Sequence, residues 1–75
     1  MFDVNLVIKG RGRIINQDFK ETETIRNVLE KLKFKFNSDG VYLNNKRVIA
    51  PNLDIPMVEL DQFQRWHKNT VRLYD

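Results

Sequence analysis

The chain has 75 residues, of which 41% are hydrophobic and 31% charged, and it contains no cysteine. This length predicts a single domain, residues 1–75, that buries only about 60% of its unfolded surface. The absence of thiols excludes disulfides, thiolate zinc sites and thiol catalysis, and it favours a reducing cytoplasm. The 13 basic and 10 acidic side chains give a modest net charge of +3, spread along the chain. No apolar run approaches the roughly 20 residues that cross a membrane, so we expect no membrane partner.

The N-terminal segment alternates apolar and polar side chains, which predicts a half-buried strand. Its inward-facing residues are Phe2, Val4, Leu6 and Ile8. Gly10 and Gly12 then allow the chain to turn into a second strand, from about Arg13 to Lys20. Alternation along this second strand predicts inward-facing Ile15, Gln17 and Phe19, and outward-facing Ile14 and Asp18.

The next segment carries the signals of an amphipathic helix. Thr22 or Thr24 can cap the first amide groups, and apolar residues recur at i, i+3, i+4 and i+7. These residues are Ile25, Val28, Leu29 and Leu32. Lysines gather at the C-terminal end, where the helix dipole favours cations. We expect "NSDG" to end the helix, with Asn37 or Gly40 in the left-handed conformation, and the phenylalanines of "FKF" to pack where helix meets sheet.

The second half of the chain predicts a hairpin, a crossover and a final strand. "VYLNNKRV" indicates two short strands around a tight turn at Asn44 and Asn45. Pro51 and Pro56 bracket an apolar segment that should cross the core as an irregular connection. A last strand, Thr70 to Tyr74, is expected to return to the middle of the sheet. This order predicts an α+β fold of the β-grasp type, a mixed four- to five-stranded sheet with one helix packed across one face.

Three segments resemble those of the ubiquitin-like proteins, in the same order along the chain. "TIRNVLEKL" (Thr24 to Leu32) resembles the start of the family's helix, and "VYLNNKRV" resembles its strand, tight turn and lysine-containing return. "LDQFQRWHKNTVRLY" (Leu60 to Tyr74) has the family's spacing of a leucine, a buried aromatic residue, and a threonine followed by a strand. The resemblance covers nearly the whole chain and implies the ubiquitin-like β-grasp fold.

The covalent chemistry of that family depends on the C-terminus. Ubiquitin and the related bacterial sulfur carriers have a flexible tail ending in Gly-Gly, which an activating enzyme threads through a narrow channel. Here the sequence stops at Tyr74 and Asp75, so we expect neither conjugation nor sulfur transfer. Tail-less bacterial ubiquitin-like proteins, such as those of type VII secretion systems, are the closer comparison. The alternative is a truncated sulfur carrier or modifier, which a longer reading frame ending in Gly-Gly would restore.

The resemblance also implies a binding surface on the sheet face opposite the helix. The positions that ubiquitin-like proteins use there correspond to Tyr42 and Tyr74, with Arg47 and Arg72 as neighbours. Tyrosine and arginine are enriched in the residues that dominate protein interfaces. We therefore expect a non-enzymatic protein–protein interaction module, an accessory or regulatory subunit of a larger bacterial or phage assembly in the cytoplasm. The alternative interpretation is that these tyrosines only half-cover a sheet.

A small basic nucleic-acid-binding domain is a further alternative. Cations near the first turn and at the helix end can contact phosphates, and Tyr42, Tyr74 or Trp66 can stack on bases. The cations are Lys9, Arg11, Arg13, Lys31, Lys33 and Lys35. Against this alternative, the helix dipole alone would select lysines at the helix end.

The sequence contains little that could support catalysis or a metal site. His67 is the only histidine, and one histidine without cysteine cannot fill a zinc shell. Ser38 is the only serine, and neither a nucleophile motif nor a phosphate-binding loop surrounds it. We therefore expect no catalytic residues, no metal and no cofactor.

Overall fold

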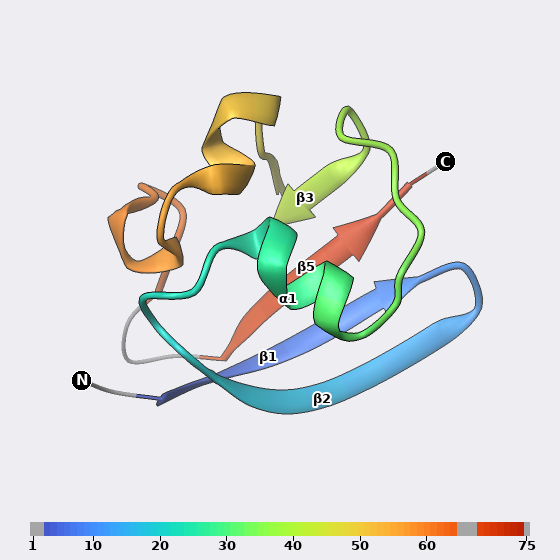
Figure 1. Cartoon of the computed structure of the whole chain (residues 1–75), viewed down its shortest axis with the longest axis horizontal. Coiled ribbons are helices and arrows are strands. Elements are labelled where there is room, and N and C mark those ends of the chain that lie inside the picture. The colour runs from blue at the N-terminus through green and yellow to red at the C-terminus, as the bar shows by residue number, and fades with distance from the viewer. Residues whose placement is uncertain (1–2, 65–67, 75) are drawn as a thin grey trace.

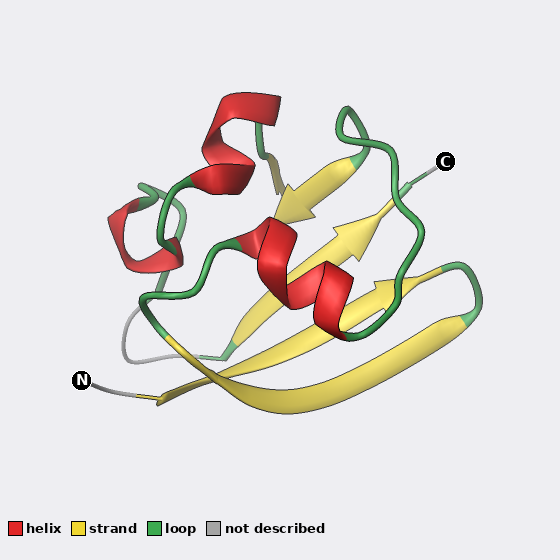
Figure 2. Ribbon diagram, in the orientation of Figure 1, coloured by secondary structure: helices red, strands yellow, loops and turns green. Residues whose placement is uncertain are grey.

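The structure is a computed structural model that describes residues 3–64 and 68–74. Its elements are β1 (Asp3–Gly10), β2 (Arg13–Lys20), α1 (Ile25–Lys31), β3 (Val41–Leu43), β4 (Lys46–Arg47), the 3₁₀ helices η1 (Ala50–Asp54) and η2 (Met57–Glu59), and β5 (Asn69–Leu73). Helix α1 lies across one face of the sheet (Figure 1). The two 3₁₀ helices lie toward the end at which β5 begins (Figure 2). No helix within the described residues is long and apolar enough to span a membrane.

The sheet is mixed, and the last strand lies in its middle. The order of its five strands is β2-β1-β5-β3-β4. Strand β1 pairs with β2 in antiparallel orientation and with β5 in parallel orientation. The predicted α+β class, with a mixed sheet and a helix across one face, is confirmed. Strand β5 begins and ends one residue earlier than the predicted span of Thr70 to Tyr74.

The sheet has two different faces, which we call the covered face and the open face. The covered face packs against α1 and the 3₁₀ helices, and its buried residues from the sheet include Val4, Leu6, Ile8, Phe19, Val41, Leu43, Val71 and Leu73. The predicted faces of β2 are confirmed, because Phe19 is buried and Ile15 packs against the core while Ile14 is 72% exposed. Gln17 has the same parity as Phe19, but its side chain is exposed. It lies on an edge strand that the short helix does not fully cover.

The helix ends earlier than predicted, at Lys31. Lys33 takes the left-handed conformation, with φ of 58°, in place of Asn37 or Gly40. The Lys33 N–H donates to the Glu30 carbonyl over 3.1 Å and the Phe34 N–H to the Leu29 carbonyl over 3.0 Å, which is a Schellman motif. At about 100° per residue, a longer helix would carry Phe34 to the side opposite Ile25, away from the core. Ending the helix early lets Phe34 become buried.

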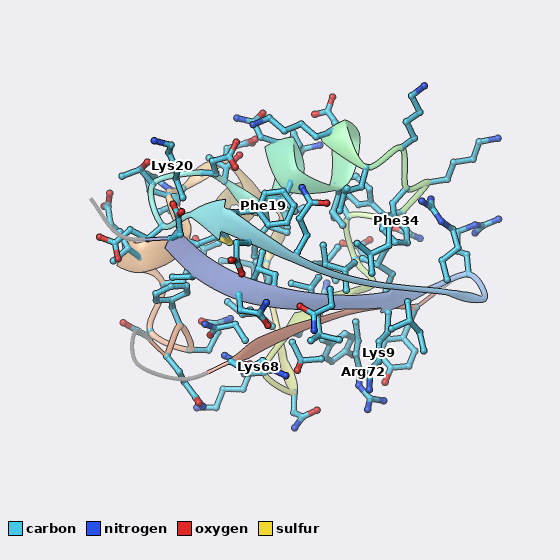
Figure 3. The ribbon with its side chains drawn as sticks, turned by 90° about the horizontal axis from the view of Figure 1, so that it is seen from below. Lys9, Phe19, Lys20, Phe34, Lys68 and Arg72 are labelled. Carbon is cyan, nitrogen blue, oxygen red and sulfur yellow. The ribbon has the colours of Figure 1, made fainter. Side chains whose placement is uncertain are left out.

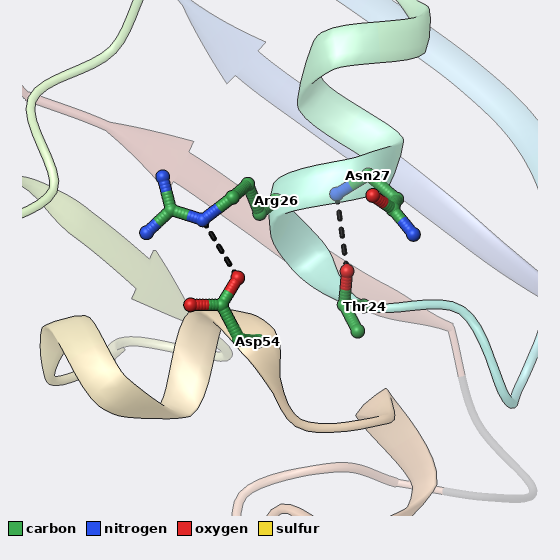
Figure 4. Close-up of polar contacts among 4 residues, drawn as sticks. All are labelled: Thr24, Arg26, Asn27 and Asp54. Atoms are coloured by element: carbon green, nitrogen blue, oxygen red, sulfur yellow. Dashed lines mark hydrogen bonds and ion pairs between the residues drawn. The ribbon is translucent and has the colours of Figure 1, made fainter.

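The start of α1 is fixed by two polar contacts, shown in Figure 4. The Thr24 hydroxyl accepts a hydrogen bond from the Asn27 N–H over 3.1 Å, so Thr24 and not Thr22 is the N-cap. Arg26 forms an ion pair of 2.7 Å with Asp54 at the end of η1. The helix is therefore tied directly to the crossover segment.

The crossover segment is more regular than predicted. Pro51 occupies the first turn of η1, where its fixed φ and missing N–H cost nothing. The apolar side chains of Leu53 and Met57 are fully buried beneath the segment, as expected. The Met57 N–H donates to the Glu23 carbonyl over 2.9 Å and holds the crossover against the residues before α1. Trp66 and His67 lie outside the described residues.

Candidate functional site

Five side chains, one from each strand, form a line across the open face. Lys9 of β1 is paired with Ile14 of β2 on one side and with Arg72 of β5 on the other. Tyr42 of β3 is paired with Arg72 and, on its other side, with Arg47 of β4. We call this line the cross-strand row: Ile14, Lys9, Arg72, Tyr42 and Arg47. Because paired strands lie about 4.8 Å apart, neighbouring side chains of the row can act on one ligand.

The two tyrosines predicted to bind a partner lie in contact. The rings of Tyr42 and Tyr74 meet edge to face, with centroids 5.0 Å apart and an interplanar angle of 79°. Tyr74 is 51% exposed, whereas Tyr42 is half-buried. A hollow of about 240 Å³, which we call the tyrosine hollow, is lined by Tyr42, Asn45, Arg72 and Tyr74. The structure thus brings together three of the four predicted protein-binding residues around one hollow, with Arg47 beside Tyr42 in the row.

Backbone contacts hold Tyr74 beyond the end of β5. Its N–H donates to the Gly40 carbonyl over 2.7 Å. A Cβ at position 40 would collide with the Tyr74 carbonyl oxygen, so the two backbones come this close only because residue 40 is glycine. Leu73, the preceding residue, is buried in the core. The ring of Tyr74 is therefore positioned by the fold, and the contact with Tyr42 follows from it.

Lys9 and Arg72 are neighbouring cations on the open face. Both point away from α1, on the lower side of the view in Figure 3. They line a second hollow of about 220 Å³, which we call the cation hollow, together with Gly10, Leu73 and Tyr74. Within residues 3–64 and 68–74, neither cation has a side-chain hydrogen bond or an ion pair. This pair of charges is available to a ligand.

Arg47 differs from these two cations because it has an acidic neighbour. Its guanidinium lies 3.3 Å from an Asp39 carboxylate oxygen. Both side chains are more than half exposed, so water screens the pair and it contributes little to stability. Its effect is instead to place a negative charge at the β4 end of the cross-strand row.

Arg13 plays a structural part that its sequence context did not indicate. Its guanidinium donates to the carbonyls of Leu32 and Lys33, over 3.2 and 3.4 Å, at the C-terminal end of α1. It also lies 4.3 Å from the ring centroid of Phe34, in a cation–π contact. Arg13 thus supplies positive charge where the helix dipole is negative and joins β2 to the helix end.

The six cations predicted for nucleic-acid contacts do not all share one surface. Lys9 lies on the open face, whereas Arg13 reaches over the covered face to the helix end. Lys31 forms an ion pair with Glu23 on the helix side. The others are exposed at the turn and after the helix, at positions Arg11, Lys33 and Lys35.

Sequence reasoning missed a buried amide cluster at the start of β5. Asn69 is fully buried, and its carboxamide donates to the Gln64 carbonyl over 3.0 Å and accepts from the Gln64 N–H over 2.9 Å. The Asn44 amide donates to the Asn69 side-chain oxygen over 2.7 Å. The alternation of β5 contained a signal, because Asn69 shares the inward parity of Val71 and Leu73. The cluster fixes the turn that carries Asn45 to one side of the tyrosine hollow.

A third hollow differs from these two in its charge. This larger hollow of about 380 Å³ lies along the edge strand, and both charge signs are mixed in its lining of Asp3, Gln17, Asp18, Phe19, Lys20, Glu23 and Lys31. Among the described residues, no group of three or more His, Cys, Asp or Glu side chains could hold a metal ion.

Comparisons of the chain with protein-family models, with curated proteins and with solved structures gave no match.

Proposed function

We propose that this chain is a ubiquitin-like β-grasp domain that works in the cytoplasm as a non-enzymatic protein-binding module. It would be an accessory or regulatory subunit that binds its partner non-covalently. One observation carries this proposal: Tyr42 and Tyr74, which lie far apart in the sequence, meet on the open face beside Arg72 and a hollow.

The tyrosine hollow suits a side chain from another protein. A ring or branched aliphatic group placed there would lie against both tyrosines, where edge-to-face aromatic contacts add about 0.5–1.5 kcal/mol to the burial of area. Arg72 at the rim offers both an apolar stem and a charged fork. Clusters of this composition dominate the binding energy of many interfaces.

A capture experiment tests the proposal. The tagged protein and its Tyr42→Ala/Tyr74→Ala variant are used to capture partners from native extract, and the retained proteins are compared by mass spectrometry. We expect a set of partners that the double variant loses. Ile49→Ala is the matched control, since Ile49 is also a large apolar side chain, 53% exposed, but lies outside the row. Retention of the same partners by the double variant, with its circular dichroism unchanged, would exclude this face.

Nucleic-acid binding is the second candidate, because the cross-strand row interleaves cations with Tyr42. Such interleaving suits a single strand whose phosphates meet cations while its bases stack on rings. Fluorescence anisotropy with labelled oligo(dT) at increasing salt tests it. This candidate is supported if log K falls with log salt at a slope of about −1.4 or steeper, which corresponds to two phosphates at about −0.7 each. Arg72→Gln should also weaken the binding. Absence of binding at low salt would remove it.

A further inference from the structure

We infer that the partner is an acidic peptide segment, whose carboxylates meet Lys9 and Arg72 while a neighbouring ring or aliphatic side chain fills the tyrosine hollow. This inference rests on the proposed function and adds the chemistry of the ligand. Its basis is which cationic side chains of the described residues form hydrogen bonds or ion pairs within the protein.

The described cations divide into those that the fold uses and those that it leaves available. Arg13 holds the helix end, Arg26 pairs with Asp54, and Lys31 pairs with Glu23. Lys9 and Arg72 have no such contact among the described residues, and the same is true of Lys20, Lys33, Lys35, Lys46 and Lys68. Lys9 and Arg72 are in addition neighbours in the β1–β5 register, so their charges lie side by side. Like charges at paired positions repel each other, so this arrangement works against folding. An arrangement that breaks a local rule without a compensating contact is typical of a binding site.

The surroundings of this cation pair favour a short acidic segment over a long polyanion. Asp39 sits beside Arg47 at the β4 end of the cross-strand row. Asp18 is paired with Asn5, which lies on the same face as Lys9 and four residues before it in β1. The Asp18 carboxylate accepts a hydrogen bond from Asn5 over 3.0 Å. A phosphate backbone running across the face would meet these carboxylates. One or two carboxylates placed between Lys9 and Arg72 would not.

The two hollows fix the order of the ligand groups. The cation hollow and the tyrosine hollow share Arg72 and Tyr74, so they lie on either side of the same two side chains. A peptide segment that crosses these two side chains can place an acidic group in the cation hollow and an apolar group in the tyrosine hollow. Because the bidentate Arg72 fork matches a carboxylate, the acidic group also sets the direction of the segment.

Peptide selection from a random 12-residue display library tests this inference. The library is panned on the wild-type protein and on two variants, Lys9→Gln/Arg72→Gln and Lys33→Gln/Lys35→Gln. The second variant is a matched control because it removes the same charge from exposed lysines off the open face. We expect the wild type to enrich peptides of net negative charge that contain a large apolar residue. One such peptide is then synthesised and titrated. Compared with its affinity for the wild type, it should bind the Lys9→Gln/Arg72→Gln variant, which we call the row variant, at least ~10-fold more weakly, and its affinity for the control variant should stay within about 2-fold.

The other outcomes are decisive. No enrichment, enrichment without acidic bias, or equal binding by the row variant and the wild type would overturn the inference. If peptides without acidic residues are enriched and lost on Tyr42→Ala/Tyr74→Ala, the protein-binding function stands and only the acidic preference fails. Panning a random 20-nucleotide single-stranded DNA pool in parallel identifies the remaining case. If DNA alone is enriched, and the row variant loses it, the cation pair binds phosphate and the peptide inference is wrong.

Discussion

The two faces of the sheet are built from the same strands but differ in how their side chains are packed. On the covered face, side chains such as Leu6, Ile8 and Val71 are almost fully buried, and each is fixed by its neighbours. On the open face, the side chains of their sequence neighbours Lys9 and Arg72 have no hydrogen bond or ion pair within the described residues. Substitutions on the covered face should therefore destabilise the fold, whereas substitutions of these exposed cations should affect binding alone.

Two adjacent residues of β1 test this difference most directly. Leu6 is fully buried on the covered face, and Val7, the next residue, is half-buried on the open face. We expect Leu6→Ala to lower the free energy of unfolding by about 3 kcal/mol, through lost burial and a residual cavity. Val7→Ala should cost about 1 kcal/mol or less, because no layer packs on it. Urea denaturation measures both, and equal costs would mean that the open face is packed as the covered face is.

Asn69 shows that the covered face also depends on one polar group. We expect Asn69→Leu to lower the free energy of unfolding by about 2 kcal/mol, because it leaves the Gln64 backbone groups without their buried partner. Asn27→Ala is the control, since the Asn27 side chain is exposed on α1 and alanine favours a helix. The same denaturation experiment compares them. A neutral effect of Asn69→Leu would show that water replaces these hydrogen bonds.

The sequence was informative where a local pattern decides the structure. Within the described residues, the alternation of β1 and β2 predicted the two faces correctly except at Gln17, which is exposed, while Phe2 lies outside the described residues. The placement of Tyr42 and Tyr74 on a common surface agrees with the observed ring contact.

The hydrogen bonds of Arg13 could not be predicted in this way. Alternation places Arg13 on the covered face with Ile15 and places Arg72 on the open face. It does not show where the helix ends, and that position supplies the carbonyls to which Arg13 donates. Such long-range contacts leave no periodic signal.

A pair of substitutions separates these two arginines. Arg13→Gln should lower the free energy of unfolding by about 1 kcal/mol, because it removes both the cation–π contact with Phe34 and a charge at the helix end. Arg72→Gln should change it by less than about 0.5 kcal/mol, since the side chain is exposed, and relief of repulsion from Lys9 acts in the stabilising direction. Thermal unfolding at low salt measures both. If Arg72→Gln is the more destabilising of the two, Arg72 has a structural partner and is not free to bind.

The smallest effect concerns the residue that ends the helix. Lys33 is exposed and holds φ at 58°, a conformation that costs a lysine free energy and that glycine adopts readily. Lys33→Gly should therefore raise the free energy of unfolding by about 0.5 kcal/mol, the relief of strain outweighing the extra entropy of the unfolded chain. Lys35→Gly, which removes the same charge at an exposed position that is not left-handed, should destabilise. Because both sites lie outside the cross-strand row, peptide affinity should not change in either variant, and a parallel loss of stability in both would show that the Schellman motif does not form.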